Sequence, residues 1–161
     1  MKSYLLSTLK VEFEAAGPEA FMTTAPHPWL LWAPDRWKPP LRQTAPLPPD
    51  TRPPSESAAL ARESLAIELV PLTRPVVLGR AAECDLIIND GRLSARHLAF
   101  HFSADGWSAE DLGSTNGTRV DGQALEPGAP CPLVDGACID AAQVVLLFLT
   151  SERLWPRLMA S

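Results

Sequence analysis

Three short polar motifs lie between residues 79 and 122, each beside a short apolar segment. In chain order they are Gly79-Arg80, Ser94-Ala95-Arg96-His97 and Ser114-Thr115-Asn116-Gly117-Thr118. An arginine guanidinium can form two parallel, charge-assisted hydrogen bonds with phosphate oxygens. Serine and threonine hydroxyls and an asparagine carboxamide add further donors. If the loops that carry these motifs meet at one rim of a sheet, the chemistry they offer is recognition of a phosphate monoester.

The local sequence predicts a role for each motif. Gly79 ends an apolar segment, and we expect it to be able to take a positive φ angle and to place Arg80 at the rim of the sheet. His97 is expected to hydrogen-bond inward and brace the loop of Ser94. An Asn-Gly pair is typical of a tight turn, so Asn116-Gly117 is also compatible with a plain hairpin. A hairpin does not require the Ser-Thr pair that precedes it, which favours a functional role.

In this order the motifs resemble the forkhead-associated (FHA) domain, a phosphothreonine-binding module, and the resemblance covers roughly residues 64 to 150. It implies that the arginine and hydroxyls contact the phosphate, and that the asparagine amide bonds the peptide main chain beside it. Many relatives carry a polar or basic residue where this chain has Ala95, and we expect Arg96 to replace part of that contact. The residues expected to bind phosphothreonine are Arg80, Ser94, Arg96, Thr115 and Asn116, and those expected to support the site are Gly79, His97 and Gly117.

The resemblance also implies selectivity for threonine. FHA domains hold the γ-methyl group of phosphothreonine in a small apolar pocket, and the loss of one methyl there costs about 1 kcal/mol. Phosphoserine should therefore bind less well. Because the contacts are few, we expect micromolar affinity, about −8 kcal/mol.

Short strand-like segments recur after residue 57 between turn signals such as Asp105-Gly106 and Asp135-Gly136, which is typical of a β-sandwich. We predict an all-β, FHA-type sandwich of two antiparallel sheets with a short C-terminal helix that Ser151 caps and an N-terminal Pro/Trp-rich extension. The strands are expected near residues 66–70, 76–78, 86–88, 98–102, 107–111, 118–120, 131–133 and 144–149.

Proline content divides the chain near residue 57, because 11 of the 17 prolines lie in residues 1–57. Residues 1–37 are predicted to form an extension that either packs on the domain or serves as an exposed docking segment, since three of the five tryptophans lie in it. Residues 38–57 hold seven prolines and are predicted to be a semi-rigid linker. Residues 58–161 are predicted to be the FHA domain with its C-terminal helix.

Composition argues against several classes of protein. The net charge of −5 and the lack of a basic stripe argue against nucleic acid as the main partner. His97 and His101 have no further ligands at the spacing of a metal site, and we expect neither a metal nor a cofactor. No segment is apolar enough to span a membrane. The three cysteines are expected to be reduced thiols in a cytoplasmic protein.

The resulting hypothesis is a non-catalytic adaptor in Ser/Thr kinase signalling that binds a threonine-phosphorylated protein. One alternative is a phospho-independent scaffold that uses the N-terminal arm and a sheet face. Another is autoregulation, in which an upstream threonine (Thr23, Thr24, Thr44 or Thr51) is phosphorylated and blocks the site. An enzyme is disfavoured because no nucleophile elbow or phosphate-cradling glycine loop is present, and the aspartates Asp85, Asp90 and Asp111 are interpreted as turn and loop residues.

Overall fold

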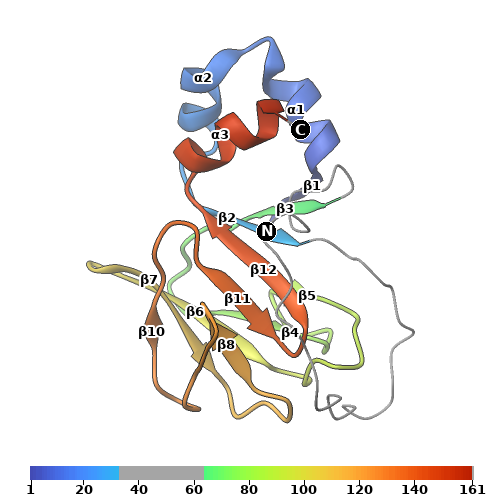
Figure 1. The fold of residues 1–161 in the computed structure, drawn as a ribbon, viewed down its shortest axis with the longest axis vertical. Coiled ribbons are helices and arrows are strands. Elements are labelled where there is room, and N and C mark those ends of the chain that lie inside the picture. The colour runs from blue at the N-terminus through green and yellow to red at the C-terminus, as the bar shows by residue number, and fades with distance from the viewer. Residues whose placement is uncertain (33–63, 161) are drawn as a thin grey trace.

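The structure, a computed structural model, describes residues 1–32 and 64–160, and two β-sheets stack beneath a group of helices (Figure 1). The first sheet has seven strands in the order β1-β3-β2-β12-β11-β8-β9, and the second has five in the order β10-β7-β6-β4-β5. The strands of the first sheet are β1 (Ser3–Leu5), β3 (Leu65–Glu68), β2 (Trp29–Trp32), β12 (Val144–Leu149), β11 (Cys138–Ala141), β8 (Thr118–Val120) and β9 (Gln123–Ala124). Those of the second are β10 (Cys131–Pro132), β7 (Gly106–Asp111), β6 (Leu98–Ser103), β4 (Val76–Gly79) and β5 (Leu86–Ile87).

The prediction of a β-sandwich of two sheets with a C-terminal helix is confirmed. Each of the eight segments predicted as strands contains one, and all pairs are antiparallel except β4 with β5, which run parallel. Four strands were not predicted from the sequence: β1, β2, β9 and β11. Three of these are short edge strands or lie in the tryptophan-rich arm, where period-two alternation is weak.

The burial of both faces of β12 explains why its sequence is a continuous apolar run. Leu146 and Phe148 face the core between the two sheets, whereas Leu147 and Leu149 face a second core under the helices. A strand buried on both faces needs apolar side chains at every position. β12 lies inside the sheet between β2 and β11.

The N-terminal arm supplies a strand in the middle of the seven-stranded sheet. β2 pairs antiparallel with both β3 and β12, so that Trp29 lies opposite Glu68 on one side and Leu149 on the other. The Trp29 side chain is 1% exposed. The described part of the arm is therefore an integral part of the seven-stranded sheet, where it pairs with β3 and β12.

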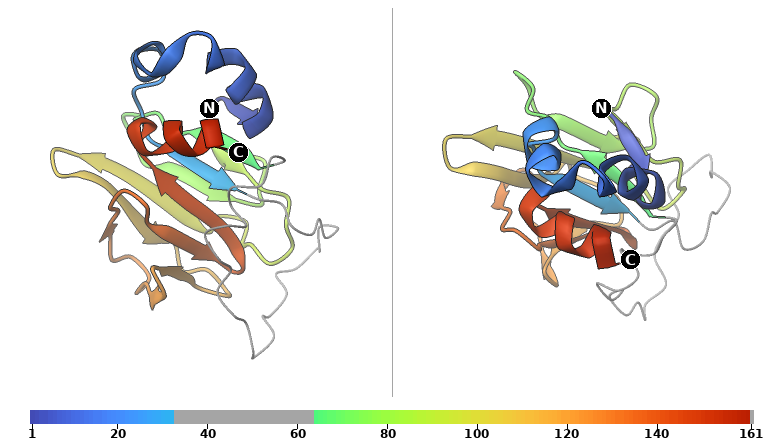
Figure 2. Two further views of the ribbon diagram at one scale, coloured as in Figure 1. Left: turned by 45° about the horizontal axis from the view of Figure 1, so that its top comes forward. Right: turned by 90° about the horizontal axis from the view of Figure 1, so that it is seen from above.

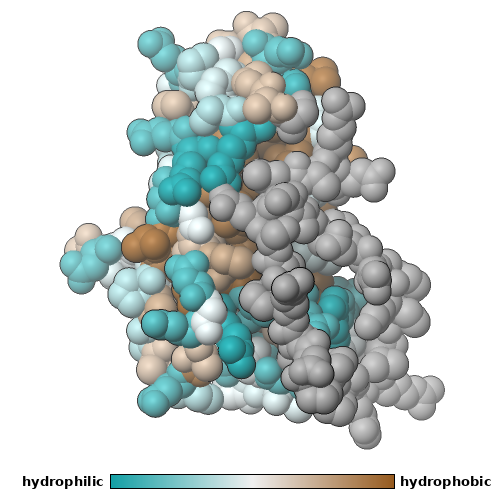
Figure 3. Space-filling view, in the orientation of Figure 1, coloured by the Kyte–Doolittle hydropathy of each residue, from teal (hydrophilic) through white to brown (hydrophobic). Residues whose placement is uncertain are grey.

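Three helices cover the face of the seven-stranded sheet that points away from the five-stranded sheet (Figure 2). They are α1 (Leu6–Glu14), α2 (Gly17–Thr24) and α3 (Ser151–Ala160). Trp29 lies beneath them and stacks on Phe21 at a centroid distance of 5.9 Å. Hydrophilic side chains gather over the first turn of α3 on the face shown in Figure 3, where Glu152 and Arg153 are exposed.

The predicted cap of the C-terminal helix is corrected by the structure. The hydroxyl of Thr150, not that of Ser151, accepts the backbone N–H of Arg153 at 3.3 Å, which is the geometry of an N-cap. Ser151 has another role: its Oγ accepts a bond from Trp29 Nε1 at 3.0 Å and bonds the carbonyl of Ala25 at 2.5 Å. Ser151 thereby ties the helix to the N-terminal arm.

Several predictions fall outside the described residues: the linker at 38–57, Trp37, and the threonines Thr44 and Thr51. Thr23 and Thr24 are described and lie exposed at the end of α2. In residues 1–32 and 64–160, no helix has the length and apolar character that crossing a membrane requires.

Candidate functional site

Three loops meet at one end of the sandwich and are joined by hydrogen bonds. The loop after β4 is held to the loop between β5 and β6 by two backbone bonds: Arg80 N–H donates to the Ser94 carbonyl at 3.1 Å, and Ala81 N–H to the Ala95 carbonyl at 3.0 Å. The loop between β7 and β8 joins them through the backbone N–H of Thr115, which donates to Ser94 Oγ at 3.0 Å. The structure thus brings the three predicted motifs together.

Gly79 is required for a reason other than the one predicted. It is not among the residues with positive φ, so its ability to take a left-handed conformation is not used here. A Cβ atom at this position would lie 2.3 Å from the carbonyl oxygen of Ala95. Glycine is needed because the backbone of the second loop passes directly over it.

Arg80 and Ser94 are half-buried, and both hold parts of the loops in place. Arg80 Nε donates to the carbonyl of Leu93 at 3.1 Å. Ser94 Oγ accepts from the Thr115 backbone, which leaves the hydroxyl proton of Ser94 to be donated elsewhere. The Thr115 side chain is exposed, and no described residue hydrogen-bonds its hydroxyl.

Asn116 does not lie in a plain hairpin. Its loop leaves β7 in the five-stranded sheet and enters β8 in the seven-stranded sheet, so it crosses between the two layers. Gly117 has a φ of 77°, whereas Asn116 is not among the residues with positive φ. The Asn116 carboxamide donates through Nδ2 to the carbonyl of Arg92 at 3.0 Å.

The ring of His97 is fully buried and braces two of the loops. Its Nδ1 accepts the backbone N–H of Ser94 at 3.1 Å, so this nitrogen carries no proton. Its Nε2 lies 3.1 Å from the carbonyl of Gly117 and must be the donor in that bond. Burial lowers the pKa of His97 below its ordinary value, although the Gly117 carbonyl and the nearby charge of Asp111 oppose the shift.

A buried aspartate that the sequence analysis interpreted as a turn or loop residue anchors the third loop. Asp111 is 1% exposed at the end of β7. Its carboxylate accepts bonds from the backbone N–H of Gly113 at 2.9 Å, from Ser114 N and Oγ at 2.8 and 2.6 Å, and from Thr118 Oγ1 at 2.6 Å. Burial alone would raise the pKa of Asp111, but the bonds from Ser114 and Thr118 hold it below its ordinary value. The signal in the sequence is an aspartate followed by serine, threonine and glycine at close spacing.

Comparison with known proteins bears directly on this end of the sandwich. The FHA domain family model matches residues 76–141, which include all three loops. This chain contains an FHA domain. It is 37% identical over 60 residues to the FHA domain-containing protein FhaB of Mycobacterium tuberculosis, a match that covers 37% of this chain and 39% of FhaB. It is 34% identical over 73 residues to FhaB of Mycolicibacterium smegmatis, covering 45% of this chain and 46% of that protein.

A solved structure supports the fold. It comes from a study described as "Structural and functional analysis of phosphothreonine-dependent FHA domain interactions", and it aligns with a TM-score of 0.51 at 19% identity, covering 76% of this chain and 96% of that one. At this identity the likeness concerns the fold alone. The match with this chain spans less than half the length of either FhaB protein.

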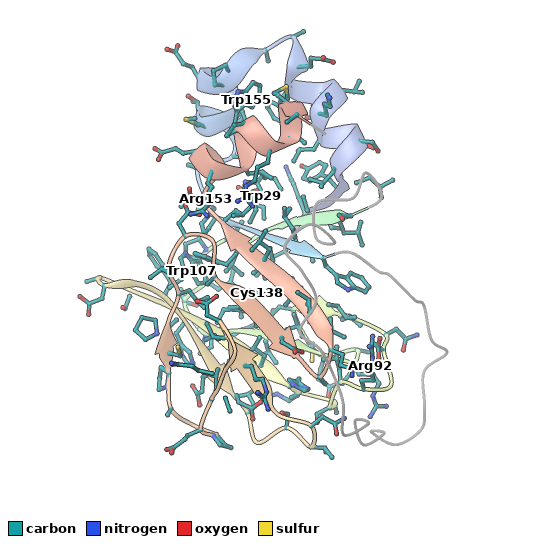
Figure 4. All side chains as sticks on the ribbon, viewed as in Figure 1. Trp29, Arg92, Trp107, Cys138, Arg153 and Trp155 are labelled. Carbon is teal, nitrogen blue, oxygen red and sulfur yellow. The ribbon has the colours of Figure 1, made fainter. Side chains whose placement is uncertain are left out.

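A second arginine of the FHA domain, Arg92, was not predicted as a site residue. Its guanidinium forms a fork with Asp90, with Nε to Oδ1 at 2.9 Å and Nη2 to Oδ2 at 2.6 Å. The hydrogen bonds that the guanidinium donates to the Asp90 carboxylate raise the pKa of Arg92. Figure 4 shows Arg92 beside the first residues of β12, at the end of the molecule away from Trp155. The Asp-x-Arg spacing was the only signal in the sequence.

Arg96 differs from the other candidate arginine of the FHA domain, Arg80, in the contacts of its side chain. Its side chain is exposed and forms no hydrogen bond with any residue that the structure describes. The neighbouring Ala95 carbonyl is instead held by Cys84, whose Sγ donates to it at 3.1 Å. Burial raises the pKa of the Cys84 thiol. Nowhere in residues 1–32 and 64–160 do three or more His, Cys, Asp or Glu side chains gather as metal ligands.

Proposed function

We propose that this chain is a non-catalytic adaptor whose FHA domain binds a threonine-phosphorylated protein. The observation that carries the proposal is the hydrogen-bonded junction of the three loops at Ser94, whose hydroxyl accepts from the backbone of Thr115. The bond fixes the orientation of the Ser94 hydroxyl and sets it next to Thr115. Donors that are held in place before the ligand arrives bind it without a further ordering cost.

Charge supports the same ligand. A phosphothreonine side chain carries a charge close to −2 at neutral pH. Arg80, Arg92 and Arg96 all belong to the two loops that flank β5, in a chain whose net charge is −5. The same loops also carry Glu83, Asp85 and Asp90, and Asp90 pairs with Arg92, so the guanidinium groups suit a single dianion rather than an extended polyanion.

The division of roles follows the FHA resemblance. Arg80, Ser94, Arg96 and Thr115 would contact phosphate oxygens, and the Asn116 carboxamide would bond the peptide main chain. His97, Gly79 and Gly117 would hold the loops. We further propose that the phosphate is added by a Ser/Thr kinase and that binding in the cytoplasm is reversible, with micromolar affinity.

A phospho-independent scaffold remains the second candidate, but the arm gives it less support than its tryptophans suggested. Trp29 is buried beneath the helices and Trp32 is half-buried in β2. The two described tryptophans of the arm are therefore used within the fold, whereas Met1, Leu5 and Val11 are exposed. The scaffold proposal would have to rest on these side chains or on another surface, and not on the described tryptophans.

The test is a titration of a phosphothreonine peptide library against the wild type and two arginine variants. We expect Arg80→Ala to abolish binding while the melting temperature stays near that of the wild type. Arg119→Ala is the matched control, because Arg119 is an exposed arginine on β8. Equal binding of phosphorylated and unphosphorylated peptides would contradict the proposal. A pull-down with wild type and Arg80→Ala, compared by mass spectrometry, would then identify the partner.

A further inference from the structure

The turn between β11 and β12 holds two residues in an unusual backbone conformation. Ala142 has a φ of 54° and Gln143 a φ of 69°. Two-residue hairpin turns with two positive φ angles ordinarily use Asn-Gly or Asp-Gly, because a Cβ atom disfavours this conformation, while glycine has none and asparagine and aspartate can bond the local backbone. Strained residues of this kind persist where the surrounding structure requires them.

Ala142 and Gln143 are retained for different reasons. Ala142 is 2% exposed, and its methyl group packs in the core between the sheets. Gln143 is only half-buried and belongs to neither apolar core. Its side chain instead reaches across to a loop of the other sheet, where Oε1 accepts from Arg92 Nη1 at 3.3 Å. Packing therefore explains the alanine but not the glutamine.

The contact with Arg92 leads to the candidate binding residues. Asp90 holds Arg92 at its backbone N–H, at 2.9 Å, as well as at its guanidinium. The backbone carbonyl of Arg92 accepts the bond from Asn116 Nδ2 at 3.0 Å. A change in the position of Arg92 would therefore turn the Asn116 carboxamide.

We propose that Gln143 is a positioning residue of the phosphopeptide site: with Asp90 it fixes Arg92, and the Arg92 carbonyl orients the Asn116 carboxamide toward the peptide main chain. This inference rests on the proposed function. It makes the β11–β12 turn, which belongs to the seven-stranded sheet, a part of the recognition machinery built on the loops of the FHA domain.

The decisive variant is Gln143→Asn. Asparagine tolerates positive φ better than glutamine, and its side chain is one methylene too short to keep the contact with Arg92. We expect an unchanged or higher melting temperature together with a roughly three- to ten-fold weaker phosphopeptide affinity, the range expected for the loss of one ordinary hydrogen bond. Affinity for free phosphothreonine, which lacks the flanking peptide main chain, should be unchanged in NMR titrations.

Two further variants separate positioning from a general structural role. Gln143→Gly should raise the melting temperature and weaken phosphopeptide binding like Gln143→Asn. In an Asn116→Ala background, the change Gln143→Asn should have no additional effect on affinity, since the group it positions is gone.

Each other outcome is informative. The inference is overturned if Gln143→Asn and Gln143→Gly both leave the phosphopeptide affinity unchanged, or if both lower the melting temperature. It is also overturned if they weaken the binding of free phosphothreonine as much as that of the phosphopeptide. The same holds if they weaken phosphopeptide binding as much in the Asn116→Ala background as in the wild type. If the wild type fails to bind phosphopeptide at all, the proposed function fails and this inference with it. If the wild type binds and Arg80→Ala does not, a null result at Gln143 overturns this inference alone.

Discussion

The Nδ1 atom of His97 accepts a hydrogen bond from the backbone N–H of Ser94 at 3.1 Å, inside a ring that is fully buried. An acceptor nitrogen carries no proton, so the bond exists only while the imidazole is neutral. The opposite nitrogen is bonded to the carbonyl of Gly117. The loops that carry Ser94 and Gly117 are therefore linked through one protonation state of one side chain.

This linkage predicts a loss of stability in mild acid. The folded-state pKa of His97 is lowered by burial, so between that value and about 6.5 the unfolded chain binds a proton that the folded chain does not. The free energy of unfolding should fall as pH drops below about 6.5, by at most about 1.4 kcal/mol per pH unit. Urea unfolding from pH 8 to pH 5 measures it. NMR titration of His97 with an ordinary midpoint would contradict the prediction.

Removal of the Asp111 charge should loosen the third loop. Asp111→Asn keeps the size of the side chain but puts an NH2 group, which cannot accept, in place of the oxygen that accepts from the Ser114 and Thr118 hydroxyls, and we expect a loss of about 2–4 kcal/mol in unfolding free energy. Phosphopeptide affinity should fall as well. Chemical denaturation and peptide titration measure the two effects, with the exposed Asp105→Asn as control. A variant as stable as the control would show that the carboxylate does not anchor the loop.

A methyl group at residue 79 should displace the second loop. In Gly79→Ala the new Cβ would lie 2.3 Å from the Ala95 carbonyl oxygen, which is backbone and cannot rotate away. We expect about 1–3 kcal/mol lower stability and weakened phosphopeptide binding. Gly106→Ala, in the β6–β7 hairpin, is the control: it strains a positive φ of 102° but meets nothing within 4 Å. It should lose stability and keep its affinity.

Trp29 should matter for stability and not for recognition. Trp29→Ala would empty the core under the three helices and is expected to cost about 3–5 kcal/mol. The ring lies at the helical end of the molecule, away from Arg92 (Figure 4). Thermal unfolding and a low-temperature phosphopeptide titration test the two parts. Reduced affinity in a fully folded Trp29→Ala sample would argue that the arm takes part in binding.

Eight of the described strands and the three motifs of the candidate site could be predicted from the sequence, because both are encoded locally. The alternation of Leu98-Ala99-Phe100-His101-Phe102 and the apolar run from Val144 set which faces are buried. The Gly-Arg, Ser-x-Arg-His and Ser-Thr-Asn-Gly motifs were each readable in a few residues. Their common position follows because turns at the ends of paired strands gather at the sheet rims.

Only the tertiary structure decided which distant segments meet. No local pattern encodes that β2 enters the sheet between β3 and β12, since strand pairing depends on register and on the removal of apolar surface from water. The same holds for Gly79: no side chain fits at this position, because the backbone of Ala95 passes over it. The bond from Arg92 to Gln143 joins loops of different sheets. It exists only once the two layers are stacked, since its partners are 51 positions apart in the chain and lie on loops of different sheets.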